Sequence, residues 1–175
     1  TATPYRMKTG QLCGPDSLLT DVCYEAGVKE LIDQGFLCPL KSIAGRKKVD
    51  FNGLHIRAGE FVASEVETLM DDDETVLAAC REVIEATQDR NSVLFFCASV
   101  AHAEHVKATI EKLSGQECGL VSGDTPGGQR ADLLARFKGE KRPGLLFDDE
   151  QPLKYLANVN VLTTGFDAPN IDAVV

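Results

Sequence analysis

The sequence predicts an α/β fold in which helices flank a parallel sheet, and three observations support this prediction. Strand-like segments occur at residues 92–98, 118–121 and 158–164, and the first of them is typical of a strand that is buried on both faces. Apolar residues with helical spacing occupy the segments before and between them, at residues 76–87, 100–113 and 126–137. Helix-like and strand-like segments therefore alternate, which is the pattern of successive crossover units in a parallel sheet.

The composition indicates a folded domain of ordinary size. The 175 residues are 43% apolar and 26% charged, enough for one domain with a real core. The chain has 27 acidic and 18 basic side chains, and the resulting net charge of −9 argues against coating of nucleic acid by charge alone. No apolar run of about 18 residues and no secretory signal are visible. We therefore expect a cytoplasmic protein with no membrane partner.

The cysteines and histidines do not indicate a metal site. The six cysteines contain no CxxC pair, which favours reduced thiols in an intracellular protein, and Cys97 lies in an apolar run where a buried thiol is expected. His102 and His105 are three residues apart on a predicted helix but have no evident third ligand. We therefore interpret both as surface histidines.

The first part of the chain has weaker patterns. Residues 1–20 are rich in turn-forming residues, and residues 28–34 can form two helical turns that end at Gly35. Residues 36–43 and 54–57 are compatible with short β-strands. We divide the chain into a leading segment, a variable β and loop segment, and a partial α/β domain, at residues 1–45, 46–73 and 74–175; the resemblance described below implies that the leading segment holds motif III and an inter-lobe connection.

The helices of the third segment have recognisable ends. Asp71 and Glu74 have the spacing of a capping box before the first helix. The second helix ends before Gly115, and Pro126 suits the first turn of the third. The polar stretch 139–152 interrupts the pattern as either a solvated excursion or a partner contact. A further strand begins at residues 171–175, and because the chain ends inside it we expect a piece of a longer protein.

Three loops follow the predicted strands, at the sheet edge where parallel α/β proteins bind ligands. In the first, the Ser99 hydroxyl can cap the following helix, or the free amides there can bind a phosphate. In the second, residues 122–129, the loop amides and Arg130 can hold a phosphate oxygen, and a surface ion pair of Arg130 is the alternative. In the third, threonine hydroxyls suit phosphate oxygens, and Asp167 can accept hydrogen bonds from ribose hydroxyls or stabilise an Asx turn.

These segments, in this order, resemble the motifs of superfamily 2 DEAD/DEAH-box helicases and translocases. Residues 1–6, TATPYR, resemble motif III, and residues 93–105 resemble motif IV. GDTP at residues 123–126, with Arg130 and Phe137 at matching distances, is similar to the motif IVa region. NVNVLTTGFDAP at residues 158–169 resembles motif V. The likeness is to the second RecA-like domain, the helicase C-terminal domain, and within the family to bacterial RadD-like helicases.

The resemblance implies an ATP-dependent motor of two RecA-like lobes, with ATP and Mg²⁺ between the lobes and nucleic acid, DNA rather than RNA, across them. The first RecA-like lobe of the same protein would be a partner. The implied roles are coupling for Thr1, Ala2 and Thr3, nucleotide contact for Gly165 and Asp167, and nucleic-acid contact for Ser99, Gly123, Asp124, Arg130, Thr163 and Thr164. The sequence departs from many relatives at Val159, where they carry threonine.

Several parts of such a motor are absent from the sequence. It has no GxxxxGK[ST] phosphate loop, no DExx carboxylates and no arginine-rich motif VI. We therefore expect the chain alone to contain no catalytic residue, to bind no cofactor tightly and not to hydrolyse ATP. The alternative is a non-catalytic nucleotide-binding or nucleic-acid-binding module, or an interaction module, on a RecA-like fold.

Overall fold

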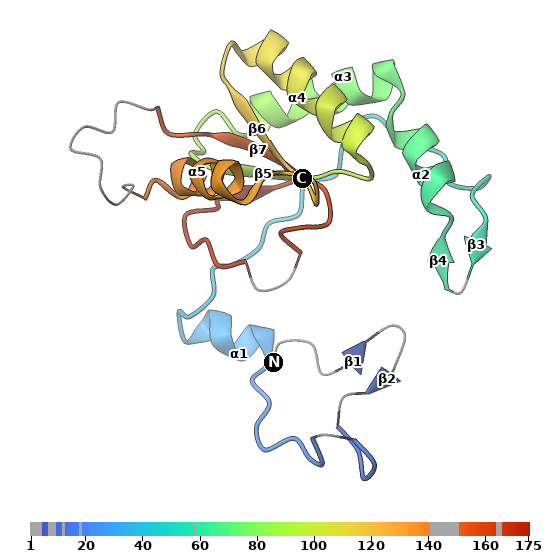
Figure 1. The fold of residues 1–175 in the computed structure, drawn as a ribbon, viewed down its shortest axis with the longest axis vertical. Helices are drawn as coiled ribbons and strands as arrows, with labels where there is room; N and C mark the ends of the chain where they lie inside the picture. Colours follow the sequence, from blue (N-terminus) through green and yellow to red (C-terminus); the bar gives the residue numbers. More distant parts are fainter. Residues whose placement is uncertain are drawn as a thin grey trace. The chain divides into compact units, whose positions relative to one another are not determined.

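The computed structural model describes residues 5–6, 10–11, 13–17, 19–57, 59–140, 151–163 and 166–175 (Figure 1). The chain forms two compact units, residues 1–44 and residues 45–175, and each is described by itself. The predicted three-part division of the chain stays a prediction. Within the described residues, no helix combines the length and the apolar character that a membrane crossing requires.

The first unit has little regular structure among its described residues. Strand β1 (Tyr5–Arg6) pairs antiparallel with β2 (Gly10–Gln11), and α1 spans Val28–Asp33 as the sequence predicts. The chain leaves α1 through Gly35, whose φ of 77° is a left-handed conformation suited to glycine. The predicted strand at residues 36–43 is wrong, because these residues pair with no other strand. Their large apolar side chains are instead exposed, as is Val28 of α1.

The second unit begins with a short hairpin and a helix. Strands β3 (Ile56–Arg57) and β4 (Glu60–Phe61) pair antiparallel, in part as predicted for residues 54–57. Helix α2 (Ala63–Met70) follows, within a segment that the sequence analysis assigned to β and loop structure. Apolar residues three and four positions apart at Ala63, Val66 and Met70 fit one helical face, so the signal was present in the sequence.

A four-stranded parallel sheet forms the centre of this unit. Its strands are β5 (Val93–Phe96), β6 (Cys118–Val121), β7 (Tyr155–Asn158) and β8 (Ala173–Val174), in the order β6-β7-β5-β8. All three pairings are parallel. The fold is therefore an α/β fold with helices on a parallel sheet, as predicted, and it is consistent with the expected RecA-like lobe. Strand β7 lies earlier than expected, because Asn158 is its last residue rather than its first.

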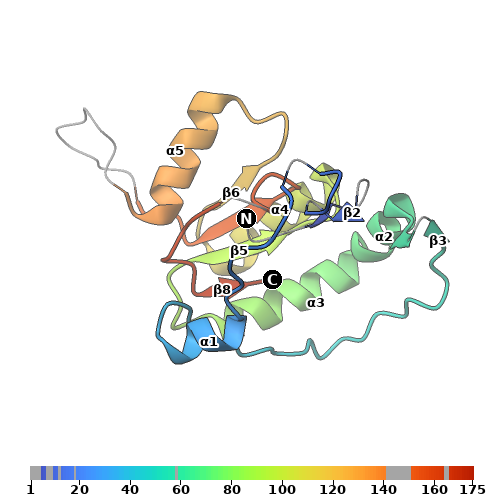
Figure 2. The ribbon, with the colours of Figure 1, turned by 90° about the horizontal axis from the view of Figure 1, so that it is seen from below.

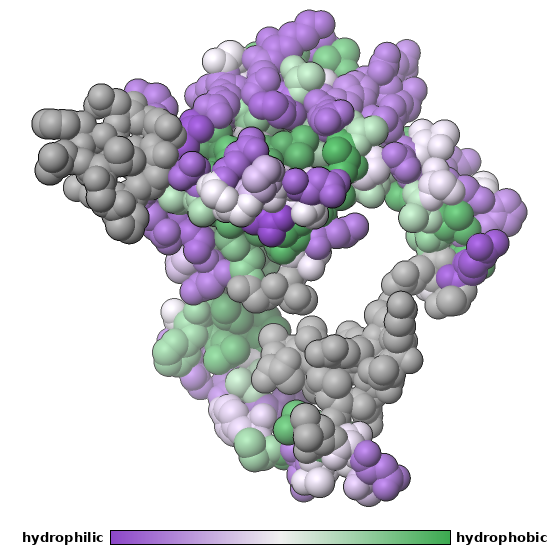
Figure 3. Space-filling view, in the orientation of Figure 1, coloured by the Kyte–Doolittle hydropathy of each residue, from purple (hydrophilic) through white to green (hydrophobic). Residues whose placement is uncertain are grey.

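Helices cover both faces of the sheet (Figures 1 and 2). Helices α3 (Asp73–Ala86) and α4 (Val100–Ser114) pack on one face, and α5 (Gly127–Lys138) packs on the other. Alternate strand residues divide between the two faces, since Val93 and Phe95 join the core under α3 and α4 whereas Leu94 joins the core with Phe137 of α5. Figure 3 shows hydrophilic residues on the outward sides of α3 and α4. The sheet is thus the middle of three layers.

The helix ends agree with the sequence to within one residue. The N-cap of α3 is Asp72 rather than Asp71, and its carboxylate accepts hydrogen bonds from the backbone N and the hydroxyl of Thr75 at 2.9 and 2.8 Å. Helix α4 ends at Gly115, which has the left-handed φ of 68° expected of a C-cap glycine. Pro126 is the N-cap of α5, one position before the predicted first turn.

Strand β6 contains a glycine that the packing requires. A Cβ atom at Gly119 would lie 2.6 Å from Leu153 Cδ2 and 2.9 Å from Leu156 Cδ1. These distances are shorter than carbon atoms can approach without displacement, so the two leucines occupy the space that a side chain would need. Gly119 therefore leaves room beside the β6 backbone for the side chains of Leu153 and Leu156.

The six thiols divide between the two units. Cys80, Cys97 and Cys118 of the second unit are buried, and burial raises the pKa of these thiols to about 11, 12 and 12 respectively. The prediction of a buried Cys97 is therefore confirmed. The other three cysteines, at residues 13, 23 and 38, lie in the first unit, where two are exposed and Cys13 is half-buried. All six are free thiols.

Candidate nucleotide and nucleic-acid interface

The three predicted loops leave the sheet from one transverse row of residues. Asn158, the last residue of β7, is paired with Phe96 of β5 on one side and with Val121 of β6 on the other. Two further backbone hydrogen bonds connect the strand ends next to this row, from Cys97 N to Asn158 O at 2.9 Å and from Val159 N to Val121 O at 3.0 Å. Because the strands are parallel, all three loops begin at the same edge. The sheet therefore brings the predicted site loops together.

The first loop is the turn from β5 into α4. Ser99 is the N-cap of α4, and its Oγ accepts a hydrogen bond from His102 N at 3.1 Å. The structure thus shows the capping role that the sequence allowed, and contact with nucleic acid stays a prediction for Ser99. A second hydrogen bond in this turn runs from Ala98 N to Nδ1 of the His102 ring at 3.2 Å.

The two histidines of α4 lie in different environments. His102 is 8% exposed, so its interpretation as a surface histidine is wrong; the helix turns this position toward the core beside Ala103 and Val106. Burial lowers the pKa of His102 below its ordinary value of 6.5. His105 is half-buried, and its Nδ1 lies 2.8 Å from Asp71 Oδ1. Within the part of the chain that the structure describes, no cluster of side chains is arranged to bind a metal ion.

The second loop, residues 122–125, is held by its own polar groups and by Arg130. Ser122 N donates to Thr125 Oγ1 at 2.9 Å, and Asp124 N donates to Ser122 Oγ at 3.3 Å. Arg130 Nη2 donates to the carbonyl oxygens of three loop residues, Ser122 at 2.8 Å and Gly123 and Thr125 at 3.3 Å each. Arg130 therefore braces the loop, and among the described residues it forms no ion pair of the kind that the sequence allowed as the alternative. Gly123 and Asp124 are exposed at its tip.

The third loop begins with a turn that Asn158 organises. Its side chain is 0% exposed, and Oδ1 accepts hydrogen bonds from Val161 N at 3.0 Å and Leu162 N at 2.9 Å. The backbone thus turns directly after β7 instead of continuing as a strand. This role of Asn158 was not among the predictions, although a polar residue at the end of an apolar strand was a signal that could have indicated it.

The remaining residues of this loop lie on both sides of a gap in the described chain. Thr163 and Asp167 are exposed, and Thr164 and Gly165 lie outside the described residues. Phe166 packs against the core under α5 and so holds the loop on the sheet. Among the described residues the Asp167 carboxylate accepts no hydrogen bond, so the Asx turn offered as its alternative role is not seen there. The exposed Asp167 carboxylate can accept hydrogen bonds from the hydroxyl groups of a ligand.

Other predicted features cannot be placed. Thr1, Ala2 and Thr3, the predicted coupling residues, lie outside the described residues, as does most of the stretch 139–152. The described structure therefore brings Ser99, Gly123, Asp124, Arg130 and Thr163 to the carboxyl edge of the sheet. It does not place Asp167 with them, because the adjacent Phe166 lies against Lys138 at the end of α5 and Asn170 contacts Phe137 and Ser92.

Comparison with known proteins assigns this architecture. The family model of the helicase conserved C-terminal domain matches residues 75–175. The chain belongs to this family. The matched range includes the whole parallel sheet and all three loops, so the candidate site lies entirely within the helicase C-terminal domain.

Two curated relatives cover most of the chain. One, from Saccharomyces cerevisiae (strain ATCC 204508 / S288c), is named "Putative ATP-dependent helicase IRC3" and is 23% identical over 159 residues, 90% of this chain and 21% of that protein. The other, from Schizosaccharomyces pombe (strain 972 / ATCC 24843), is named "Putative mitochondrial ATP-dependent helicase irc3" and is 27% identical over 176 residues, 99% of this chain and 26% of that protein. The chain thus spans about a fifth to a quarter of the length of these relatives.

Removal of the Ser99 cap is expected to weaken this helicase C-terminal domain. In Ser99→Ala the amide of His102 loses its acceptor, and the free energy of unfolding should fall by about 1 kcal/mol, as for other N-cap serines. Urea denaturation followed by circular dichroism measures this change. Ser64→Ala is the matched control, because Ser64 is exposed on α2, and its unfolding midpoint should stay at the wild-type value. Equal midpoints for both variants would show that the cap contributes nothing.

Proposed function

We propose that this chain is the second RecA-like lobe of an ATP-dependent nucleic-acid helicase or translocase. The observation that carries the proposal is the convergence of three polar loops on one row of residues, Phe96, Asn158 and Val121, at the carboxyl edge of a parallel sheet. Ligands of open α/β sheets bind outside this edge. Membership of the helicase C-terminal family and the names of the two relatives support a motor protein in particular.

Within this proposal the residues have distinct roles. Asp167, with Gly165, would face a nucleotide held between this lobe and the first RecA-like lobe of the same protein. Ser99, Gly123, Asp124, Thr163 and Thr164 would lie along the nucleic-acid backbone, where amides and hydroxyls donate to phosphate oxygens. The exposure of Gly123, Asp124 and Thr163 supports this role. Thr1, Ala2 and Thr3 would couple hydrolysis to movement of the lobes.

Arg130 would act on nucleic acid through the loop that it braces, because its Nη2 is already bonded to three loop carbonyl groups. Its contribution is then to keep residues 122–125 in one conformation, so that the loop presents its tip to a phosphate without first becoming ordered. A preformed loop loses less conformational entropy on binding.

The cofactors of the proposed motor are ATP and Mg²⁺. The exposed Asp167 carboxylate fits a hydroxyl-bearing nucleotide, whereas no group of carboxylates among the described residues fits a metal ion. Mg²⁺ and the triphosphate would therefore be held by other parts of the protein, since the chain has no phosphate loop and no DExx sequence. Hydrolysis needs both lobes on this proposal, and the isolated chain would be inactive.

The finer assignments belong to the same proposal. We propose a DNA track rather than RNA and a motor of the RadD-like kind. A cytoplasmic location is also proposed, although the name of the S. pombe relative includes the word mitochondrial.

ATP hydrolysis by the complete protein tests the proposal. The rate is measured without nucleic acid and with single-stranded DNA, double-stranded DNA or RNA, and residues 1–175 alone are assayed in parallel. We expect stimulation by DNA in the complete protein and no hydrolysis by the isolated chain. Hydrolysis that only RNA stimulates would correct the track, and the absence of hydrolysis under every condition would favour a non-catalytic binding module.

A further inference from the structure

One residue, His102, contacts the turn between β5 and α4 through both its backbone and its side chain. The backbone N–H of His102 donates to Ser99 Oγ at 3.1 Å, and the His102 ring accepts from Ala98 N at 3.2 Å through Nδ1. A ring nitrogen that accepts a hydrogen bond carries no proton, so the imidazole is neutral with its hydrogen on Nε2. Protonation of Nδ1 would place two donors against each other and remove the bond to Ala98.

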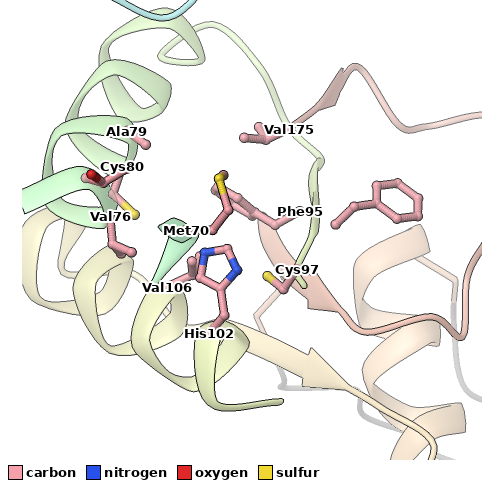
Figure 4. A pocket seen from close by; sticks show the side chains of 11 residues that line it. Met70, Val76, Ala79, Cys80, Phe95, Cys97, His102, Val106 and Val175 are labelled. Carbon is pink, nitrogen blue, oxygen red and sulfur yellow. The ribbon is translucent and has the colours of Figure 1, made fainter. Parts of the chain in front are cut away.

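The surroundings of the ring favour this neutral form. His102 lines a cavity of about 120 Å³ whose wall is otherwise formed mainly by apolar and sulfur-containing side chains, among them Met70, Cys80, Cys97 and Val106 (Figure 4). Figure 4 shows the imidazole directed into this cavity, facing Met70 and Cys97. The thiols of Cys80 and Cys97 are protonated and uncharged near neutral pH, because burial raises their pKa values to about 11 and 12 respectively. The cavity therefore offers no anion to stabilise a charged ring.

The charged groups near His102 oppose one another. Asp71 and Glu67, at the end of α2, favour the protonated ring, whereas His105 on α4 opposes it. The Asp71 carboxylate is paired with His105 at 2.8 Å. Burial outweighs these charges, and the pKa of His102 lies below 6.5.

We propose that His102 is a positioning residue whose neutral ring holds the 97–99 turn in the conformation in which Ser99 contacts the nucleic-acid backbone, so that protonation of the ring weakens nucleic-acid binding. The inference rests on the proposed function, because it takes Ser99 as a contact of the bound strand. It adds a residue that touches no ligand and a dependence on pH.

The direction of the pH effect makes the proposal distinctive. Histidines that gain positive charge in acid usually strengthen binding to a polyanion, and His55 and His105 are the other histidines of the chain. Protonation of His102 has the opposite consequence, because it releases the turn. Binding through a turn held by His102 is therefore complete above pH 6.5 and is lost as the pH falls through the lowered pKa of this ring.

The test measures binding of the complete protein to a fluorescently labelled oligothymidylate at constant ionic strength, from about pH 8 to about pH 5. His102→Asn keeps an oxygen acceptor near the position of Nδ1 but does not titrate, and His102→Leu removes the acceptor. His105→Asn is the matched control, because it removes the other α4 histidine and leaves the turn intact. Thermal unfolding of each variant is recorded under the same conditions.

We expect His102→Leu to bind roughly 2- to 10-fold more weakly than wild type near pH 8, the effect of one lost hydrogen bond. His102→Asn should match wild type near pH 8 and bind more tightly than wild type in acid, whereas His105→Asn should keep the acid loss. If His102→Leu does not fold, the comparison of His102→Asn with wild type decides alone.

Two results would overturn the inference while leaving the proposed function intact. One is wild-type affinity of a folded His102→Leu variant, and the other is an unchanged acid loss in His102→Asn. A wild-type protein that binds no oligonucleotide at any pH would instead contradict the nucleic-acid contact itself, and with it the inference. The wild-type measurement thus separates the two failures.

Discussion

Replacing Asp167 by alanine is expected to reduce the kcat/KM of ATP hydrolysis by the complete protein by about 10- to 100-fold without changing its stability. The loss corresponds to a hydrogen bond with a charged acceptor, which the carboxylate would provide to the nucleotide. Stability should not change, because Asp167 is exposed and accepts no hydrogen bond among the described residues. Steady-state hydrolysis and thermal unfolding of the same preparation measure the two effects.

Asp172 supplies the matched control for this experiment. It lies five positions further along the chain, and its carboxylate accepts hydrogen bonds from Asn91 N at 2.8 Å and Ser92 N at 3.0 Å. Asp172→Ala should therefore lower the free energy of unfolding by about 1–3 kcal/mol. Its hydrolysis rate, measured well below its unfolding temperature, should stay near wild type.

The two aspartates thus have opposite expected profiles. A hydrolysis rate in Asp167→Ala equal to that of wild type would remove Asp167 from the nucleotide site. A lowered melting temperature in the same variant would assign it a structural role instead, through a contact outside the described residues.

Asn158→Ala is expected to produce the largest loss of stability among the loop residues. The substitution leaves the backbone N–H groups of Val161 and Leu162 without their acceptor, and Leu162 is buried. Since an unpaired buried donor costs roughly 1–3 kcal/mol and Val161 is half-buried, the free energy of unfolding should fall by about 2–4 kcal/mol. For a domain of this size the melting temperature would fall by roughly 5–15 °C.

The control for Asn158 is its neighbour Asn160, which is exposed. Asn160 has a φ of 54°, a left-handed conformation that glycine adopts easily, so Asn160→Gly should leave the melting temperature nearly unchanged. Equal melting temperatures for Asn158→Ala and wild type would mean that the turn after β7 forms without the side-chain oxygen. Differential scanning calorimetry of the two variants decides the matter.

The sheet was predictable because its strands and helices repeat one pattern. The apolar run in β5 and the helical spacing in α3 and α4 each bury a face, and burial is what sequence patterns report directly. The position of β7 was not predictable in this way. Residues 158–164 remain compatible with a strand until the Asn158 side chain takes the amides of Val161 and Leu162. A local hydrogen bond from backbone to side chain thus overrides the strand preference of the segment.

The candidate site was partly predictable for the same reason. Sequence spacing placed Ser99 before a helix, and capping follows from that position. Spacing did not settle whether His102 faces the core or the solvent, because a histidine next to the apolar positions of a helix is found in either environment. Spacing also could not show that the Arg130 side chain contacts the loop before it. This contact exists because the turn at residues 122–125 places three carbonyl groups near the guanidinium. Contacts between a side chain and a distant or folded-back backbone group, such as those of His102 and Arg130, could be identified only in the structure.

The division of the thiols between the two units means that the chain carries its own reporters of local opening. An alkylating reagent can reach the exposed cysteines of residues 1–44 in the native state, whereas Cys80, Cys97 and Cys118 become accessible only when the layers around the sheet separate. Adducts on these three cysteines therefore record opening of the second unit, whereas the exposed cysteines show that the reagent was active. No substitution is required to follow this opening by mass spectrometry.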